Sequence, residues 1–244
     1  MLSPYRCKAC PNSGKLSSVP NPSVSRTPRL DRRQVIRVAL RLLDDVGLDG
    51  LTLRRLAAEL GVQAPALYWH FTNKQDLLDH VAHAMTEPWL QAVPATAVGR
   101  RWDEWLTEVG RSYRTLLLSH RDGARLVAST RPLPDSLPVL DGCIAVFQVS
   151  TSCSAGQALQ CLTTITTYVR GFVLDEYAEL LRSQAQPDGA DAEYTTIPDP
   201  ALLGAPRMDA AIEEIGSPNG ERAFEYGLHI IVDGIRSAVV THRT

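Results

Sequence analysis

The chain of 244 residues lacks the sequence patterns of membrane spans, signal peptides and β-sheets. No apolar run approaches the roughly 18 residues that a membrane span needs, so we expect no membrane association. No segment joins a basic start, an apolar stretch and a cleavage site, and we therefore predict no signal peptide and a cytoplasmic protein. No sustained alternation of apolar and polar residues occurs, which argues against a β-sheet.

Cysteine is scarce, and its five residues form no regular disulfide framework, as is typical of a reducing compartment. Cys7 and Cys10 form one CxxC pair, but neither a second pair nor two histidines follow at the spacing of a zinc site. We predict no metal site and no cofactor. A redox- or zinc-responsive regulator that uses Cys7 and Cys10 stays open as the alternative function.

Catalytic motifs are also lacking. The six histidines form no HExxH pattern, no glycine-rich loop is placed to bind phosphate, and no nucleophilic serine or Cys/His motif is recognisable. We therefore predict that the protein is not an enzyme.

Charge is unevenly distributed although the net charge is only −2. Residues 1–80 hold 12 Lys and Arg against 7 Asp and Glu, whereas the remainder holds 13 against 20. A basic amino-terminal part on an acidic body is typical of a protein that binds a polyanion at one end.

The chain divides into a tail and two helical modules. Residues 1–28 are rich in proline and serine without a periodic apolar face, so we expect a disordered tail, and one interpretation places the native start later, for instance at Val24. We predict an all-α fold with a small three-helix helix-turn-helix domain at residues 29–89 and a larger helical domain at residues 100–242. Residues 183–206 are expected to form a long connection.

Residues 29–89 are expected to contain the three helices of this domain and a fourth helix that follows them. Asp31 caps the first, whose apolar stripe is Ile36, Ala39, Leu40 and Leu43, and Gly47 ends it. Thr52 caps the second, whose inner side is Leu53, Leu56, Ala57 and Leu60, and Gly61 supplies the following left-handed turn. A short third helix has Pro65 in its first turn and Leu67 inward, and a fourth runs from its cap at Thr72 to Pro88.

The larger module is expected to contain helices at about 101–119, 134–150, 155–182 and 220–241, with a short turn near 122–127.

Two helices joined by a tight glycine turn are typical of the helix-turn-helix, whose second helix enters the DNA major groove. We place this motif at residues 52–71. The alternative is an ordinary helical hairpin with its aromatic residues in the core. Because Tyr68 and Trp69 are adjacent, they cannot share one face, so we expect one to pack and the other to reach DNA.

The segments GLDGLTLRRLAAELGV and PALYWHFTNKQDLL resemble the tetracycline-repressor (TetR) family of bacterial transcriptional regulators, and WDEWLTEVGRSYRTLLLSHRDGAR followed by STRP looks like that family's ligand-binding domain. The resemblance implies a homodimer that binds a palindromic double-stranded operator and releases it on binding a small-molecule effector. The positions that it places against DNA are Thr52, Arg54, Gln63, Ala64, Pro65, Ala66, Tyr68, His70 and Lys74. Ala64 and Ala66 replace polar residues of the tetracycline repressor and offer contact to thymine methyl groups, so a different operator is expected.

The effector site implied by the resemblance also departs from the tetracycline pattern. Val127 stands where a histidine helps to hold the magnesium–drug chelate, and magnesium needs oxygen ligands, so we expect no chelate site. What remains is an apolar cavity for a small hydrophobic ligand. Its expected lining is Leu90, Tyr113, Leu117, Val127, Thr130, Cys143 and Phe147, with Asp175 as a polar anchor. The same helical spacing is equally compatible with an ordinary core.

The resemblance also implies a switch and a dimer interface. Ligand contacts near residues 121–131 are expected to move a short helix against the helix that carries Lys74, which changes the separation of the two recognition helices. A four-helix bundle between subunits is expected from two apolar stripes. The stripes are Leu159, Leu162, Thr166, Val169 and Val173 on one helix, and Phe224, Leu228, Ile231 and Ile235 on the other.

Overall fold

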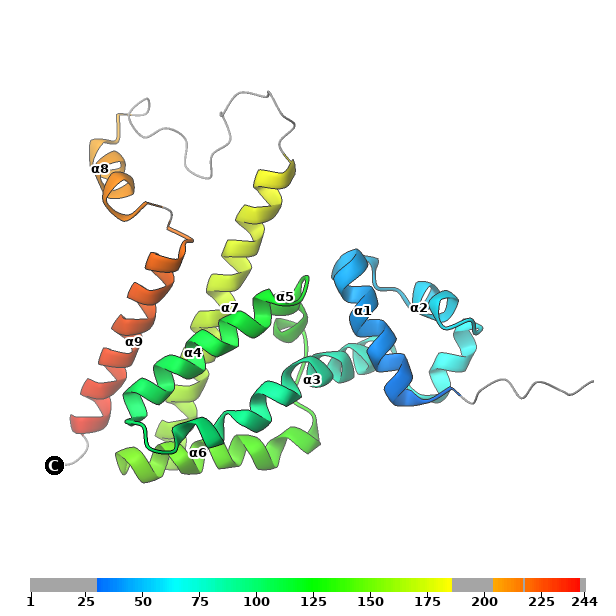
Figure 1. Ribbon diagram of the computed structural model, residues 1–244, viewed down its shortest axis with the longest axis horizontal. Coiled ribbons are helices and arrows are strands. Elements are labelled where there is room, and N and C mark those ends of the chain that lie inside the picture. Colours follow the sequence, from blue (N-terminus) through cyan, green and yellow to red (C-terminus); the bar gives the residue numbers. More distant parts are fainter. Residues whose placement is uncertain (1–29, 186–203, 217, 242–244) are drawn as a thin grey trace, which may run out of the picture. The chain divides into compact units, whose positions relative to one another are not determined.

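The computed structural model describes residues 30–185, 204–216 and 218–241, and within these ranges the chain forms helices and no strand (Figure 1). The all-α prediction is therefore confirmed for the described part. The expected disordered tail, the Cys7 and Cys10 pair and most of the expected connection at 183–206 lie outside the described residues.

Helix α1 (Arg32–Gly50) begins where predicted, because the Asp31 carboxylate accepts a hydrogen bond from the backbone N–H of Arg33. Gly47 leaves the helical conformation with φ +74°, as expected of a glycine stop. The predicted apolar stripe was partly wrong, since Ile36 and Leu40 are only half-buried. The buried face is centred about one residue earlier and consists of Val35, Val38, Ala39, Leu42 and Leu43.

Helix α2 (Leu53–Glu59) and the 3-10 helix η1 (Ala64–Trp69) form the predicted helix-turn-helix pair. The Thr52 hydroxyl caps α2 by accepting from the Arg55 N–H at 3.2 Å. Gly61 takes φ +67°, which lets the chain turn tightly between the two elements. Leu67 is buried as predicted and anchors η1 against the domain.

Helix α3 (Lys74–Ala92) departs from the prediction at both ends. Its cap is Asn73, which accepts from the Asp76 N–H at 2.9 Å, while Thr72 donates its N–H and its hydroxyl to the Asp76 carboxylate. Pro88 lies inside the helix rather than ending it. The last turn is held by tertiary contacts, since Trp89 stacks on Tyr113 and donates to Ser112.

The larger module contains the four predicted helices as α4 (Trp102–Leu118), α6 (Leu137–Thr151), α7 (Ala155–Ala185) and α9 (Glu221–Thr241). The predicted turn near 122–127 is helix α5 (Gly123–Ala128), and short 3-10 helices η2 (Pro94–Ala97) and η3 (Pro134–Ser136) connect the longer elements. Helix α8 (Pro206–Ile215) was not predicted. Helices α4 and α7 pack on each other, and α9 packs on both (Figure 1).

The core of this module combines large apolar side chains from four helices. Its fully buried members include Trp105, Leu106, Phe147, Ile165, Phe224 and Leu228. Arginine–carboxylate pairs join α4 to its neighbours, because Arg111 binds Glu225 of α9 and Arg114 binds Glu176 of α7.

No single helix of the described residues is long and apolar enough to cross a membrane. By length and composition alone, only the pair Pro134–Thr151 and Ala155–Arg182, bent by 109°, passes that test together.

Candidate DNA interface and ligand cavity

The residues predicted to face DNA gather on α2, η1 and the first turn of α3. Six of the nine are exposed, namely Thr52, Arg54, Gln63, Pro65, Tyr68 and Lys74. The other three, Ala64, Ala66 and His70, are half-buried. Such a surface offers hydroxyl, amide and phenol groups beside two exposed cations, which suits contact with bases and phosphates.

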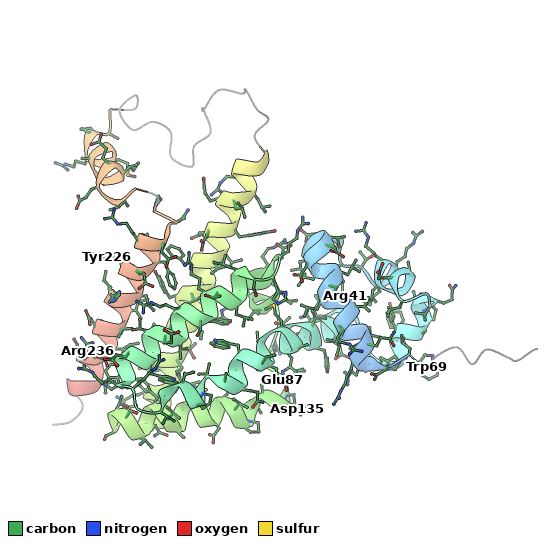
Figure 2. The ribbon with its side chains drawn as sticks, in the orientation of Figure 1. Arg41, Trp69, Glu87, Asp135, Tyr226 and Arg236 are labelled. Atoms are coloured by element: carbon green, nitrogen blue, oxygen red, sulfur yellow. The ribbon has the colours of Figure 1, made fainter. Side chains whose placement is uncertain are left out.

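Tyr68 and Trp69 are both exposed, at 57% and 87%, and Figure 2 shows Trp69 at the margin of the helices. The expectation that one of them packs in the core was wrong, because Leu67 and Phe71 fill the space inside. Sequence reasoning therefore missed Trp69 as a surface residue of the motif.

A set of polar bonds joins the end of α1 to the segment around α5, and we call it the α1–α5 contact. The Asp44 carboxylate lies 3.1 Å from His120 Nδ1 and accepts from the Arg121 N–H, while Arg125 pairs with Asp49. The Arg121 guanidinium donates to the Asp45 carbonyl at 3.0 Å. This contact connects the amino-terminal module to α5, the helix that carries Val127.

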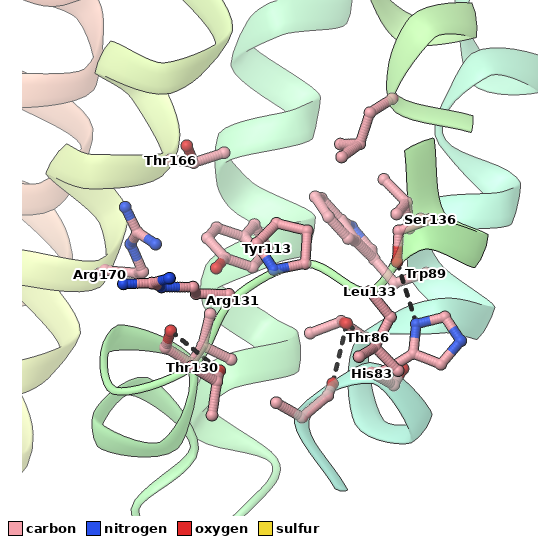
Figure 3. A pocket seen from close by; sticks show the side chains of 15 residues that line it. His83, Thr86, Trp89, Tyr113, Thr130, Arg131, Leu133, Ser136, Thr166 and Arg170 are labelled. Atoms are coloured by element: carbon pink, nitrogen blue, oxygen red, sulfur yellow. Dashed lines mark hydrogen bonds between the residues drawn. The ribbon is translucent and has the colours of Figure 1, made fainter. Parts of the chain in front are cut away.

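A cavity of about 200 Å³ lies among α3, α4, α5, α6 and α7 (Figure 3). Two aromatic residues line it, Trp89 and Tyr113, whose rings stack with centroids 4.8 Å apart. Leu90, Leu133 and Leu140 add apolar surface. Small-molecule sites are typically concave and mostly apolar with a few placed polar groups, and this cavity has that character.

The polar groups of the cavity come from separate elements. His83 Nδ1 lies 3.0 Å from the Ser136 hydroxyl, and Arg131 and Arg170 contribute guanidinium groups. Burial raises the pKa of Tyr113 to about 12, although the charge of Arg170 opposes that shift. The phenol is therefore protonated at neutral pH.

The predicted lining is only partly brought together. Leu90, Tyr113, Val127 and Thr130 line the cavity. Leu117 lines a separate hollow of about 100 Å³, and Asp175 is exposed on α7 and lines neither. Cys143 and Phe147 are instead buried in the core, where the Phe147 ring packs edge-on against Trp102. This burial raises the pKa of the Cys143 thiol to about 11.

Sequence reasoning missed the cationic part of the lining. Arg131 stands inside the STRP segment that carried the resemblance, and Arg170 interrupts the apolar face of α7 between Thr166 and Val173. A charged residue on an otherwise apolar helical stripe was the signal that could have found Arg170. His83, Thr86, Trp89 and Ser136 were missed because they become neighbours only through packing of α3 on η3 and α4.

The residues of this cavity do not fit a magnesium–drug chelate. Its lining includes no Asp or Glu, and Val127 offers no oxygen. Across the described part of the chain, no three His, Cys, Asp or Glu side chains stand close enough to hold a metal ion.

The stripes expected to form a dimer interface are mostly core of the single chain. Val169, Val173, Phe224, Leu228 and Ile235 are buried within it, and Thr166 lines the cavity. The prediction was wrong at these positions because α4 covers that side of both helices. The large apolar residues that α7 and α9 expose are Leu159, Leu180, Leu181, Tyr226 and Ile230.

Comparisons with known proteins agree with this arrangement. The family model described as bacterial regulatory proteins, tetR family, matches residues 35–81, and the tetracyclin repressor-like C-terminal domain matches residues 94–239. The class A tetracycline repressor protein from transposon 1721 of Escherichia coli is 41% identical over 208 residues, which are 85% of this chain and 91% of the relative.

Two solved structures are similar over nearly their whole length. A possible TetR family transcriptional regulator from Streptomyces coelicolor A3(2) has a TM-score of 0.67 and 33% identity, over 85% of this chain and 100% of that one. A variant of TetR from Acinetobacter baumannii AYE in complex with minocycline has a TM-score of 0.61 and 33% identity, over 86% and 98%. The chain belongs to the tetR family of bacterial regulatory proteins and is a DNA-binding transcriptional regulator with a tetracyclin repressor-like C-terminal domain.

Proposed function

We propose that this protein is a homodimeric repressor that binds a palindromic operator through α2 and η1 and releases it when a small ligand enters the cavity. The observation that carries the proposal is one hydrogen bond between the two modules. The side-chain amide of Gln75, in the first turn of α3, donates to the backbone carbonyl of Ser129 at 2.9 Å.

This bond lies between the DNA-facing surface and the cavity. Gln75 directly follows Lys74, and Ser129 directly precedes Thr130 and Arg131, which line the cavity. A ligand that moves the Ser129–Arg131 segment therefore acts on the amino terminus of α3. In a dimer, a shift there changes the distance between the two η1 elements, which must match one helical turn of DNA.

The proposed DNA contacts divide into two kinds. Arg54 and Lys74 are exposed cations on either side of η1 and suit phosphates, while Gln63 and Tyr68 suit base edges or sugar. Ala64 and Ala66 offer only methyl groups, which favours thymine at the matching positions.

The proposed dimer forms through the exposed faces of α7 and α9. Tyr226, which is labelled in Figure 2, and Ile230 lie one helical turn apart on α9. Their side chains are 71% and 54% exposed. Large apolar side chains grouped in this way are typical of a surface that another chain covers. We expect Tyr226→Asp with Ile230→Asp to yield monomers in analytical ultracentrifugation, whereas Val149→Asp, at an exposed valine on α6, leaves the dimer intact.

The proposed effector is not magnesium–tetracycline, despite the similarity to the tetracycline repressor, because the cavity lacks a carboxylate and has Val127 in its wall. Isothermal titration calorimetry with tetracycline and magnesium tests this point. Submicromolar binding would show that we have misassigned the effector.

Selection of binding sites from random double-stranded DNA with the full chain tests the repressor model. We expect enrichment of an inverted repeat whose half-sites are about 10 base pairs apart, centre to centre, or a multiple of that spacing. Enrichment of a single half-site, or of no sequence at all, contradicts the proposal.

The bond between Gln75 and Ser129 has its own test. Gln75→Ala is expected to retain operator binding in a gel shift but to need more effector for release, since the link from the cavity is lost. Gln91→Ala, at an exposed glutamine near the end of the same helix, is the matched control. Identical release curves for the two variants would show that this bond does not transmit ligand binding to the DNA-facing surface.

A further inference from the structure

Two arginines of the cavity lack the carboxylate partners that other arginines of the same module have. Arg111 binds Glu225 and Arg236 binds Asp103. Among the described residues, neither Arg131 nor Arg170 forms an ion pair, and Arg170 donates only to the Thr167 hydroxyl, at 3.1 Å.

Arg170 is half-buried and Arg131 is exposed, and both line the cavity. A guanidinium that is partly removed from water normally has an anionic partner. This end of the cavity therefore carries uncompensated positive charge.

Tyr113 adds a third donor. Its side chain is only 4% exposed, and its hydroxyl forms no hydrogen bond with any described residue. Figure 3 draws this hydroxyl at the same end of the cavity as Arg131 and Arg170. Tyr113 lines the cavity, so this hydroxyl is available to donate to a ligand atom there.

The cavity supplies no acceptor of matching charge. Its fifteen lining residues include two arginines and one histidine but no Asp or Glu. The hydroxyls of Thr86 and Thr166 already donate to backbone carbonyls of their own helices, and that of Thr130 donates to the Leu126 carbonyl of α5. The end formed by Arg131, Arg170 and Tyr113 is thus a group of donors, and we call it the donor cluster.

The opposite part of the cavity favours a planar apolar group. The indole of Trp89 and the ring of Tyr113 stack on each other and supply aromatic surface here, beside three leucines. A cavity of about 200 Å³ is smaller than the roughly 300–1,000 Å³ of drug-sized sites, so it suits a ligand of one or two rings.

We propose that the effector is a small aromatic carboxylate, whose ring lies against Trp89 and whose carboxylate binds the donor cluster. Guanidinium groups bind carboxylates through paired, charge-assisted hydrogen bonds, which a neutral ligand cannot form. The inference concerns the site itself, and only its effect on DNA rests on the proposed function. Arg131 lies two residues after Ser129, so a carboxylate bound there acts on the segment that Gln75 holds.

Matched acids and amides test the charge requirement. Calorimetry on the full chain compares benzoate with benzamide, 1-naphthoate with 1-naphthamide, and indole-3-acetate with indole-3-acetamide. We expect at least one acid to bind about tenfold or more tightly than its amide, because the charge-assisted bonds are lost in the amide. If no acid binds, or if each amide binds as well as its acid, the inference is overturned.

Variants locate the binding on the donor cluster. Arg131→Gln and Arg170→Gln are each expected to weaken the best acid about tenfold or more, while Arg170→Lys recovers part of the loss. Tyr113→Phe is expected to weaken it severalfold. Arg100→Gln, at an exposed arginine between η2 and α4, is the control and should bind the acid as the native chain does. Unchanged affinity in both glutamine variants places the acid elsewhere and rejects the site.

A gel shift with the selected DNA separates this inference from the repressor model. If the acid binds the donor cluster but leaves the DNA complex intact, the effector site stands and the release mechanism fails. If neutral aromatic compounds release DNA while no acid binds, the repressor model stands and the anionic effector is wrong.

Discussion

Oδ2 of Asp122 accepts a 2.8 Å hydrogen bond from the backbone N–H of Leu48, 74 residues earlier in the chain. The other carboxylate oxygen accepts from Arg125 at 3.1 Å. Asp122 is buried and has a left-handed backbone with φ 57°, which is uncommon for a residue with a side chain. A Cβ at Gly47 would stand 2.7 Å from Oδ2, so this close approach requires glycine there. One carboxylate thus fixes the last part of α1, at Gly47 and Leu48, against the start of α5.

Asp122→Ala is expected to destabilise the protein by about 1–3 kcal/mol, because the part-buried Leu48 N–H loses its acceptor. Urea unfolding followed by circular dichroism measures the change. Asp141→Ala, at an exposed aspartate on α6, should stay within about 0.5 kcal/mol of the native chain. Equal stability of the two variants would mean that water replaces the carboxylate at no cost.

Lys74→Gln is expected to weaken operator binding and to reduce the slope of log affinity against log salt by about 1, as for a lost phosphate contact. Gel shifts over a range of salt concentrations measure both effects. Since Lys74 is the only lysine after Lys15, its protection from acetylation by bound DNA can be read directly by mass spectrometry. Full reactivity of Lys74 in the complex would exclude it from the interface.

Tyr68→Ala is expected to weaken operator binding by about 1–3 kcal/mol, because the exposed phenol is placed beside the DNA-facing turn. The same gel shift measures it, with Arg100→Gln as the control outside the motif. Native affinity in Tyr68→Ala would show that this side chain does not touch the operator.

Phe147→Ala is expected to cost about 3–5 kcal/mol of stability, since the ring is fully buried against Trp102 and Trp105. Val149→Ala on the same helix, at a side chain that is 87% exposed, should cost little. Thermal or urea unfolding compares them. If the Phe147→Ala protein is as stable as the native chain but no longer binds the effector, Phe147 contacts the ligand and is not only a core residue.

Asp103 is expected to make the free energy of unfolding decrease at acid pH, because its pKa is lowered in the folded chain. Burial alone raises the pKa of Asp103, but hydrogen bonds from Arg101, Arg236 and the Glu104 N–H outweigh it and hold the pKa at about 2. Because this pKa is below that of the unfolded chain, the stabilisation is complete above about pH 4 and is lost as the pH falls toward 2. Solvent reaches both arginines, so we expect roughly 1–2 kcal/mol.

Asp103→Asn removes the titrating group, so its stability should vary less than that of the native chain between pH 4 and pH 2. Urea unfolding at several pH values compares the two. Parallel curves over that interval would show that other carboxylates account for the acid dependence.

Local signals predicted the elements where residues close in sequence decide the outcome. Thr52 and Asp31 cap their helices as expected, and Gly47 and Gly61 take the left-handed conformations that end them. Capping and glycine turns involve only neighbouring backbone groups, which is why they can be read from the order of residues. Pro88 shows the limit, because the contacts of Trp89 with α4 keep its helix intact.

The residues determined by themselves the all-α fold, the helix-turn-helix and its exposed polar face, since apolar periodicity, caps and glycines act over a few positions. Only tertiary structure decided which apolar stripes are core and which are surface, because α4 covers the side of α7 and α9 that had been assigned to a partner. It also decided the character of the cavity. Arg131 and Arg170 lie 39 positions apart in the chain, and packing of α5 beside α7 brings them to one donor cluster.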